Sequence, residues 1–439
     1  MPVKISVLAA KMAQKASRML NKNGSNIPGV VARKIDKNVL KKLSEKTEKI
    51  IFITGTNGKT TTSQFVGHIL KESGFKIIHN SEGSNMITGI TTAFIDNENF
   101  ISGNKADFAV IEIDEGSIEK VTKEVKPDLV VVTNFFRDQL DRFGEIDTLV
   151  NKIGESLKTT NAKLILNADD PFVSRLGRIE MRADYFGLGK NSFTFAQHNM
   201  IESTFCPECG KKLQYSYTHY GQLGHYHCEC SFGRQTPKYE ITKLQVGKGL
   251  EFNTNVGNFN IPVMGSYNAI NALAAISVCL EAGLSQEQIQ QALSTFNVGN
   301  GRMERFEDKE KQIVLNLAKN PAGVNVSLSE SQYTDNQKQY LLILNDLAYD
   351  GRDISWIWDA DYEKINNAKT ERVLCSGIRA EDMALRMKYA GIPQEKIFVI
   401  SDLEEAVNEM IRGTEDAFIV PNYTALEPTR KALINKLKK

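Results

Sequence analysis

The sequence predicts an α/β protein with two α/β domains and a cysteine-rich insertion in the first of them. From Glu48 onward, short apolar runs rich in β-branched residues alternate with amphipathic segments, as in right-handed βαβ units around a mostly parallel sheet. The alternation stops between about Met200 and Lys238, where Cys, Gly, Tyr and His dominate, and then resumes. We therefore expect a helical segment at 1–47, a central domain at 48–300 with the insertion at 201–238, and a C-terminal α/β domain at 301–439.

The expected strands of the central domain share a short, apolar, β-rich character. They are Lys49–Thr54, Lys76–His79, Phe108–Ile113, Leu129–Asn134 and Lys163–Asn167, with a helix at about 59–73. After the insertion, Tyr239–Gly257 predicts further β-structure, and a helix opens near Ser266 and runs through Asn271–Ala282. The C-terminal domain repeats the pattern, with strands expected at Lys311–Leu317, Gln339–Asn345, Arg372–Ser376, Lys396–Ile400 and Ala417–Val420.

Composition is that of a multidomain cytoplasmic enzyme. The chain has 439 residues, 41% hydrophobic and 24% charged, which suffices for two or three cores. Its 54 basic and 53 acidic residues leave a net charge of +1, so no overall field draws the protein to nucleic acid. No apolar run reaches 18 residues, and Met1–Arg18 lacks the apolar core of a signal peptide. We expect neither secretion nor a membrane span.

The start of the chain combines an amphipathic pattern with basic residues. These are Lys4, Lys11, Lys15, Arg18 and Lys22. Two interpretations remain open. The segment lies against an anionic membrane surface, or its apolar face covers the body of the protein.

The segment from Ile51 to Thr60, Ile-Phe-Ile-Thr-Gly-Thr-Asn-Gly-Lys-Thr, predicts a phosphate-binding loop. An apolar strand leads into a glycine-rich turn, and a helix begins at the Lys-Thr pair. Small residues let successive backbone N–H groups converge on phosphate oxygens, and the helix N-terminus adds partial positive charge. We expect Lys59 to reach the β- and γ-phosphates and Thr60 to hold Mg²⁺. The expected nucleotide site comprises Gly55, Thr56, Asn57, Gly58, Lys59, Thr60 and Thr61.

Acidic residues accompany a later strand. Ala109–Ser117 places Glu112 inside an apolar run and puts Asp114 and Glu115 just beyond it. An apolar strand rarely holds an acid without a reason, and phosphoryl transfer needs metal ions to neutralise charge on phosphate. Glu112 is therefore a candidate for the metal site. Asp114 and Glu115 are expected either to cap the following helix or to be solvated.

Four of the six cysteines lie within 25 residues, as Cys206-Pro-Glu-Cys209 and Cys228-Glu-Cys230. Four thiolates complete a closed tetrahedral site, so we expect a structural Zn²⁺ that holds together a segment too polar to build its own core. His225 or His227 could replace one cysteine, and a redox pair is an alternative. A nucleic-acid-binding ribbon is disfavoured because the insertion carries the acids Glu202, Glu208 and Glu229 among few basic residues.

The loop is shorter than the general P-loop, because Ile53 stands where that pattern has its first Gly. In the form G-x-x-G-K-T-T it resembles the loop of the Mur ligase and folylpolyglutamate synthetase superfamily. Thr133–Asp141 is similar to that superfamily's T-N-x-x-x-D-H-L-D segment, with Asn134 and Asp138 in matching places. The resemblance implies ATP as substrate and Mg²⁺ held by Thr60, Glu112 and Asp138.

Other positions extend or qualify the resemblance. Asn268 matches an asparagine of the adenine site, and Arg302 matches an arginine that meets ATP. The superfamily's histidine ligand of a second metal is Gln139 here, which leaves the number of Mg²⁺ ions open. Lys152 stands roughly where the superfamily carries a carbamylated lysine, although it also fits an ordinary exposed helix lysine.

The Mur-like centre, the four-cysteine ribbon and the C-terminal domain together resemble the MurT family, synthetase subunits of MurT/GatD lipid II isoglutaminyl synthases. The phosphate loop begins about fifty residues into the chain, so the precursor-binding domain of a full Mur ligase is expected to be absent. The resemblance implies ATP-dependent amidation of the D-glutamate α-carboxylate in the lipid II stem peptide. It also implies a heterodimer with a GatD-type glutaminase. The implied localisation is cytoplasmic, at the inner face of the plasma membrane, where the lipid II substrate lies.

The chain shows no Cys-His pair of its own for glutamine hydrolysis, because Cys279 and Cys375 lie in apolar segments. The resemblance points to Asp353 as an acid that orients the partner's catalytic histidine, with Asp350 as second choice. Asp346 is expected to be part of an acidic turn, and Trp356 and Trp358 are candidate interface anchors. The alternatives are a stand-alone amino-acid ligase and an ATP-binding scaffold without activity.

Overall fold

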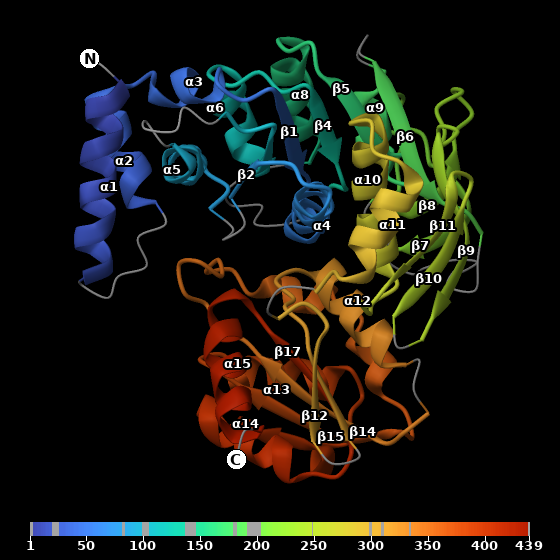
Figure 1. Cartoon of the computed structure of the whole chain (residues 1–439). Helices are drawn as coiled ribbons and strands as arrows, with labels where there is room; N and C mark the ends of the chain where they lie inside the picture. Colours follow the sequence, from blue (N-terminus) through green and yellow to red (C-terminus); the bar gives the residue numbers. More distant parts are fainter. Residues whose placement is uncertain are drawn as a thin grey trace. The chain divides into compact units, whose positions relative to one another are not determined.

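The computed structural model describes residues 3–19, 26–80, 84–98, 105–136, 146–178, 182–190, 203–247, 249–297, 301–308, 311–332 and 335–437. The chain forms two compact units (Figure 1). The first comprises Met1–Phe136, Leu140–Pro262 and Ser266–Phe296, and the second is mainly Asn297–Lys439.

The first unit is built on a nine-stranded sheet with the order β11-β10-β9-β6-β5-β4-β1-β3-β2. Its strands are β1 (Lys49–Thr54), β2 (Ile77–His79), β3 (Phe108–Glu112), β4 (Leu129–Val132), β5 (Lys163–Asn167), β6 (Ala183–Leu188), β9 (Tyr239–Val246), β10 (Leu250–Thr254) and β11 (Gly257–Ile261). Neighbours are parallel from β2 to β9, and β10 and β11 extend the sheet in antiparallel fashion. The predicted mostly parallel sheet is confirmed, while β6 is a strand that the sequence pattern did not reveal.

Helices cover both faces of this sheet. They are α4 (Lys59–Glu72), α5 (Ile87–Asn97), α6 (Ile118–Thr122), α8 (Ile146–Lys158), α9 (Pro171–Leu176), α10 (Tyr267–Glu281) and α11 (Gln286–Ser294). Apolar residues of α5, α6, α8 and α9 share one core with Ile50 and Phe52 of β1. Ile51 and Ile53 are buried outside that core, as expected from the alternation of side chains along a strand, and α4 and α10 pack together over the sheet.

The parallel order positions the site. In the sheet, β1 lies between β3 and β4. The connection after β1 runs past β3 to β2, and the connection after β3 runs back past β1 to β4, so the two connections leave in opposite directions. Ligands of α/β sheets bind at such a switch point, beyond the carboxyl ends of the strands. The phosphate loop after β1 and the polar residues after β3 and β4 therefore meet at one edge.

Three helices precede the sheet: α1 (Val3–Met19), α2 (Ile27–Ile35) and α3 (Val39–Ser44). Val7 and Ala10 of α1 are fully buried and join the core beneath α5. Because Val7 and Ala10 are buried, one face of α1 covers the body of the unit. Arg33 of α2 donates two hydrogen bonds, of 2.9 and 2.6 Å, to the Glu124 carboxylate. Within the described ranges, none of the helices combines the length and apolarity that crossing a bilayer requires.

The second unit has a six-stranded sheet with the order β12-β13-β17-β14-β15-β16, parallel except for β12. Its strands are β12 (Glu304–Asp308), β13 (Lys311–Leu315), β14 (Lys338–Ile343), β15 (Thr370–Ser376), β16 (Ile397–Val399) and β17 (Asp416–Pro421). Its helices are α12 (Pro321–Ser331), α13 (Ala380–Tyr389), α14 (Leu403–Arg412) and α15 (Tyr423–Leu437), with 3-10 turns that include η2 (Ser355–Asp359) and η3 (Tyr362–Ile365). Helices α14 and α15 share the core of β13, β14, β15 and β17. This unit is the predicted second α/β fold.

His79 on β2 makes stability depend on pH. Its imidazole Nε2 has no hydrogen-bond partner among the described residues, and burial lowers its pKa from 6.5 to about 4. Because the unfolded chain binds this proton near pH 6.5 and the folded chain only near pH 4, the free energy of unfolding should fall as the pH drops through that window. The slope from this residue is up to about 1.4 kcal/mol per pH unit. Urea unfolding of His79→Phe across that range should give a shallower slope, and an unchanged slope would contradict the assignment.

Candidate nucleotide and metal sites

The phosphate loop has a backbone that only glycine accommodates at two points. Gly55 and Gly58 adopt φ angles of 122° and 83°. A Cβ atom on Gly55 would lie 2.3 Å from Thr133 Oγ1, and one on Gly58 would lie 2.3 Å from Asn271 Oδ1. The backbone conformation disfavours a side chain at both positions, and at Gly55 the Asn134 carbonyl, 2.8 Å from such a Cβ atom, also leaves no space for one. Among the described residues, none caps the N-terminus of α4 with a side chain, so its first N–H groups are available to phosphate oxygens.

The segment after β4 fastens the loop. Thr133 Oγ1 donates to the Asn57 carbonyl at 2.7 Å, and the Thr56 N–H donates to the Asn134 carbonyl at 2.7 Å. Asn134 also accepts from the Asn57 N–H at 2.9 Å and donates to the Asn57 carbonyl at 3.0 Å. The Thr-Asn pair thus holds the shape of the phosphate loop from the neighbouring strand.

Lys59 lies inside the loop. Its ammonium donates to the Gly55 and Thr56 carbonyls and pairs with Glu115 Oε2 at 3.1 Å. Both side chains of the pair are buried. Neither expectation for Glu115, a cap or a solvated acid, is correct, because the turn after β3 carries this carboxylate to the lysine. Asp114 makes no side-chain cap to the following turn within the described chain.

Glu112 ends β3 beside Ile53 of β1 and is only 2% exposed. Its Oε1 accepts from Asn85 Nδ2 at 3.1 Å, whereas the buried Oε2 has no hydrogen-bond partner among the described residues. Asn80 holds the Glu112 backbone, accepting from its N–H at 2.9 Å and donating to its carbonyl at 2.8 Å. A buried carboxylate oxygen without a partner is costly, and a hard cation would satisfy it. The residues present fit Mg²⁺ at Glu112.

Asn80 and Asn85 were not predicted from the sequence. Asn80 follows β2 directly, so its place at the carboxyl edge of the sheet was the available signal. Asn271, which touches the loop at Gly58, was likewise overlooked beside Asn268. Asn268 is fully buried and accepts from Asn271 Nδ2 at 3.2 Å, which joins both residues of α10 to the loop.

The other predicted nucleotide residues are distributed as follows. Thr60 is half-buried and Thr61 buried in the first turn of α4. Arg302 is half-buried before β12 in the second unit. Lys152 is exposed on α8, as expected of an ordinary helix lysine. Asp138 and Gln139 lie outside the described residues, so their roles remain predictions.

The four cysteines of the ribbon converge. Their sulfur atoms all lie within 4.8 Å of one another, with 3.6 Å between Cys206 and Cys230 and 3.5 Å between Cys209 and Cys228. Zn–S bonds of about 2.3 Å in a tetrahedron place sulfurs about 3.8 Å apart, so the cluster fits Zn²⁺. The apolar core of the ribbon is small and includes two of these cysteines. The metal would therefore supply most of the cohesion.

The ribbon hairpin, β7 (Gln214–Tyr220) and β8 (Leu223–His227), packs against the segment that touches the phosphate loop. Gln222 Nε2 donates to the Phe135 carbonyl at 2.6 Å, and Tyr220 stacks on Phe136 with ring centroids 5.9 Å apart. The Phe136 N–H in turn donates to Thr56 Oγ1 at 3.1 Å. A continuous contact path therefore connects the ribbon to the nucleotide site.

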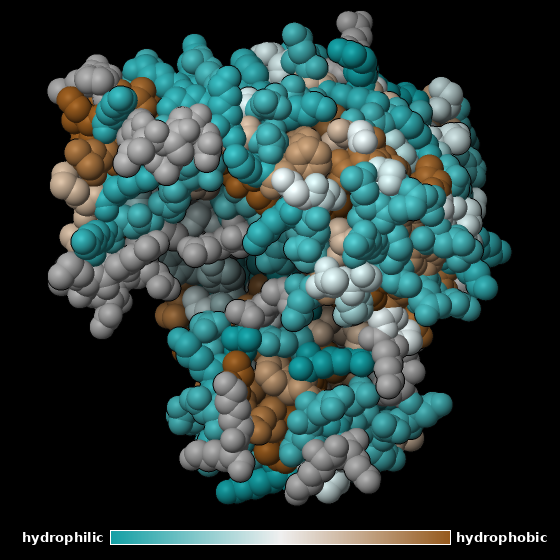
Figure 2. All heavy atoms as spheres, viewed as in Figure 1, coloured by the Kyte–Doolittle hydropathy of each residue, from teal (hydrophilic) through white to brown (hydrophobic). Residues whose placement is uncertain are grey.

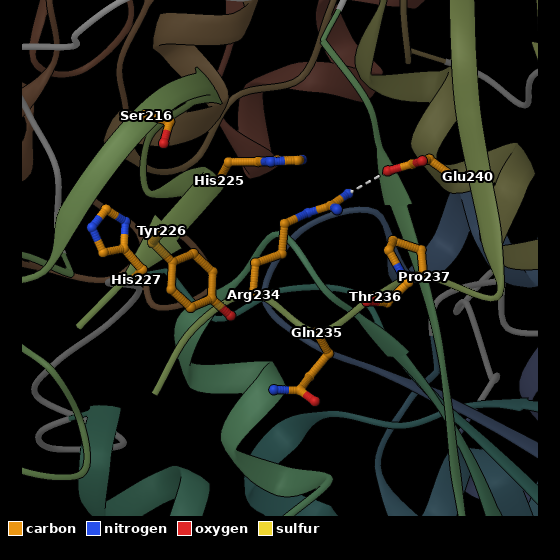
Figure 3. A pocket seen from close by; sticks show the side chains of 9 residues that line it. All are labelled: Ser216, His225, Tyr226, His227, Arg234, Gln235, Thr236, Pro237 and Glu240. Atoms are coloured by element: carbon orange, nitrogen blue, oxygen red, sulfur yellow. Dashed lines mark hydrogen bonds and ion pairs between the residues drawn. The ribbon is translucent and has the colours of Figure 1, made fainter. Parts of the chain in front are cut away.

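Two acids after β5 anchor the ribbon. Asp170 caps α9 and accepts from the Phe135 N–H at 2.8 Å, and burial raises its pKa to about 7. Asp169 pairs with Arg234 at 2.7 Å. A cavity of about 380 Å³ opens beside Arg234, which also pairs with Glu240 at 3.0 Å (Figure 3). Arg234, the guanidinium that lines this cavity, is therefore already paired with two carboxylates.

The three carboxylates of the acidic loop after β14 lie in different environments. Asp346 pairs with Arg379 at 2.6 Å. Asp350 is buried and accepts from the Thr424 N–H at 2.8 Å and from its hydroxyl at 2.6 Å. Asp353 is exposed and accepts from the Ser355 N–H at 2.8 Å, which holds its pKa below the usual value. Of the three, Asp353 is the exposed one, Asp346 is half-buried and Asp350 is buried.

Known families match both units. The family described as Mur ligase middle domain matches residues 53–279, and the one described as MurT ligase C-terminal matches residues 317–426. A Staphylococcus aureus protein named lipid II isoglutaminyl synthase (glutamine-hydrolyzing) subunit MurT is 48% identical over 424 residues, 97% of this chain and 96% of that protein. The chain belongs to the MurT family.

Solved structures agree on the fold. A pseudomurein peptide ligase type C from Methanothermus fervidus has a TM-score of 0.70 and 23% identity, over 89% of this chain and 79% of that one. MurF ligase from Thermotoga maritima, solved with ADP, has a TM-score of 0.66 and 14% identity, over 93% of this chain and 84% of that one. At these identities the likeness concerns the Mur ligase fold alone.

Proposed function

We propose that this MurT-family chain is the ATP-dependent synthetase subunit of a lipid II isoglutaminyl synthase. The observation that carries the proposal is the phosphate loop around Lys59 with the Glu112 carboxylate beside it, whose Oε2 has no partner in the described chain. The relative that spans almost the whole chain bears this activity in its name. The substrate would be the α-carboxylate of the D-glutamate residue in the lipid II stem peptide, and the product D-isoglutamine.

The reaction proceeds in two displacements. A carboxylate oxygen attacks the γ-phosphorus of ATP, and ADP leaves with the bridging oxygen. Ammonia then attacks the acyl carbon, loses a proton, and phosphate departs to leave the amide. Lys59 and the N–H groups of α4 hold the phosphates, while Thr133 and Asn134 keep the loop in shape. Preorganised charge of this kind supplies most of the rate in phosphoryl transfer.

Mg²⁺ would be held by Glu112 and Thr60, with Asp138 as a further proposed ligand, and would neutralise charge on the phosphates. We propose that Asn268 and Arg302 serve the nucleotide and that Gly55 to Thr61 cradle the phosphates. The ribbon cysteines Cys206, Cys209, Cys228 and Cys230 would hold a structural Zn²⁺. The proposed place of action is the cytoplasmic side of the membrane that carries lipid II.

The decisive experiment supplies the chain with ATP, Mg²⁺, ammonium and lipid II and follows the product by mass. Amidation replaces a hydroxyl by an amino group, so each converted molecule should lose about one mass unit, with ADP formed in equal amount. A mass increase from an added amino acid would favour a stand-alone amino-acid ligase. ATP binding without any product would favour a scaffold.

The proposed partner is a GatD-type glutaminase that docks near Asp353. Large apolar side chains are exposed around this loop, and Trp358 packs edge-on against Tyr389 with centroids 5.5 Å apart. Further exposed residues of the second unit are Leu347, Tyr349, Ile378, Leu385, Phe398 and Val399. Exposed apolar and aromatic residues in such number mark a binding surface, and Asp353 is an exposed acid of the same unit. An acid there would orient the histidine of a Cys-His pair.

Asp353→Asn should lower glutamine-dependent amidation by the heterodimer about a hundredfold or more, because an amide cannot hold the partner's imidazole in its working state. Amidation with added ammonium should stay at the wild-type level, since the nucleotide site is untouched. Asp359→Asn, another exposed acid of the same region, is the matched control and should change neither rate. Equal loss with glutamine and with ammonium would refute the role.

A further inference from the structure

Helix α1 presents an apolar stripe to solvent. Ile5, Leu8 and Met12 are 52%, 60% and 61% exposed. Their i, i+3, i+7 spacing places them on one face, opposite the buried Val7 and Ala10. Apolar side chains gather over α1 in the space-filling view (Figure 2). The helix is therefore apolar on two opposite faces, and packing within the unit accounts for only one of them.

Charge is concentrated in the same part of the chain. Residues 1–47 contain eleven Lys and Arg but only two acids, Asp36 and Glu45, whereas the remaining 392 residues contain 43 basic and 51 acidic residues. On α1, Lys4, Lys11 and Lys15 follow one another along a line beside the exposed stripe. Lys4 and Lys15 are exposed, and Lys11 donates to the Glu98 carbonyl. Residues 1–47 therefore carry a net charge of +9, whereas the rest of the chain carries −8, so this end of the molecule is the more strongly attracted to an anionic surface.

We propose that α1 docks in the plane of an anionic membrane surface, with Ile5, Leu8 and Met12 entering the headgroup region and the flanking lysines meeting lipid phosphates. A helix of 17 residues is about 25 Å long and lies along the surface. Stable peripheral binding takes two signals, apolar insertion and basic charge, and this segment offers both. The charge favours a lipid surface over an apolar protein interface, whose centre is depleted of charged residues.

The test is sedimentation of the full chain with vesicles that contain no lipid II, so it is independent of the proposed reaction. Phosphatidylcholine vesicles should bind weakly, and vesicles that also contain phosphatidylglycerol should bind at least about tenfold more tightly at low salt. Leu8→Ser/Met12→Ser should weaken binding to anionic vesicles about tenfold. Lys4→Gln/Lys15→Gln should remove much of its salt dependence. Phe205→Ser, which removes an apolar side chain 64% exposed on the ribbon, should have no effect.

Far-ultraviolet circular dichroism and the melting temperature establish that each variant is folded. Wild-type protein that binds neither vesicle, or a stripe variant that binds anionic vesicles as wild type does, would overturn the proposal. A stripe variant that loses affinity for the glutaminase partner while keeping vesicle binding would make the stripe a protein interface and would equally overturn it.

Discussion

Glu112→Gln is expected to reduce ATP-dependent amidation at least about a hundredfold. The Glu112 Oε2 atom is buried without a partner in the described chain, and Asn80 and Asn85 hold this residue in place. Glutamine keeps the shape and the contact to Asn85 but removes the negative charge that a Mg²⁺ ion requires. Loss of one preorganised charged group in a reaction of this type typically lowers the rate by a factor of about 10²–10³.

The measurement is the rate of ADP formation with ammonium as amine donor, at increasing Mg²⁺. Partial recovery at high Mg²⁺ would support weakened metal binding as the cause. Glu119→Gln is the matched control, because Glu119 is exposed on α6 and pairs with the neighbouring Lys123 at 2.7 Å. If Glu112→Gln keeps more than about a tenth of the wild-type rate, Glu112 is not a metal ligand of the reaction.

Loss of the ribbon metal is expected to destabilise the first unit and to weaken the nucleotide site. Cys206→Ser should lower the zinc content and cost at least about 3 kcal/mol in stability, since the ribbon has little apolar core of its own. Because Gln222 and Tyr220 support Phe135 and Phe136, we expect the apparent affinity for ATP to fall about tenfold or more.

Zinc content by elemental analysis, protease resistance of the ribbon and titration with ATP measure the three effects. Cys279→Ala is the control, because Cys279 is buried in α10 away from the cluster and should leave the zinc content unchanged. A Cys206→Ser protein that keeps wild-type zinc and protease resistance would show that the cluster is not a metal site. Normal ATP affinity in a protein whose ribbon lacks zinc would contradict only the inferred link between the ribbon and the nucleotide site.

Much of the architecture could be predicted because its signals are local. Strand β1, the glycine turn and α4 follow from a few consecutive residues, and the spacing of the cysteines predicts their cluster without reference to the rest of the chain. Strands β6 and β12 were missed. Strand β12 has alternating half-buried and exposed residues at a sheet edge, so its apolar signal is weak.

The sequence by itself determined the chemistry available: a phosphate loop at Gly55–Thr60, an acid within an apolar strand at Glu112, and four thiols. Only the tertiary structure decided which of these groups meet. Lys59 and Glu115 are 56 positions apart and become partners because parallel strands end at one edge. Burial, which the local sequence does not reveal at these positions, separates Asp350 from Asp353 and decides which apolar residues of α1 are packed and which are exposed. The physical reason is that residue type and spacing are properties of the chain, whereas desolvation and pairing depend on what folding brings alongside.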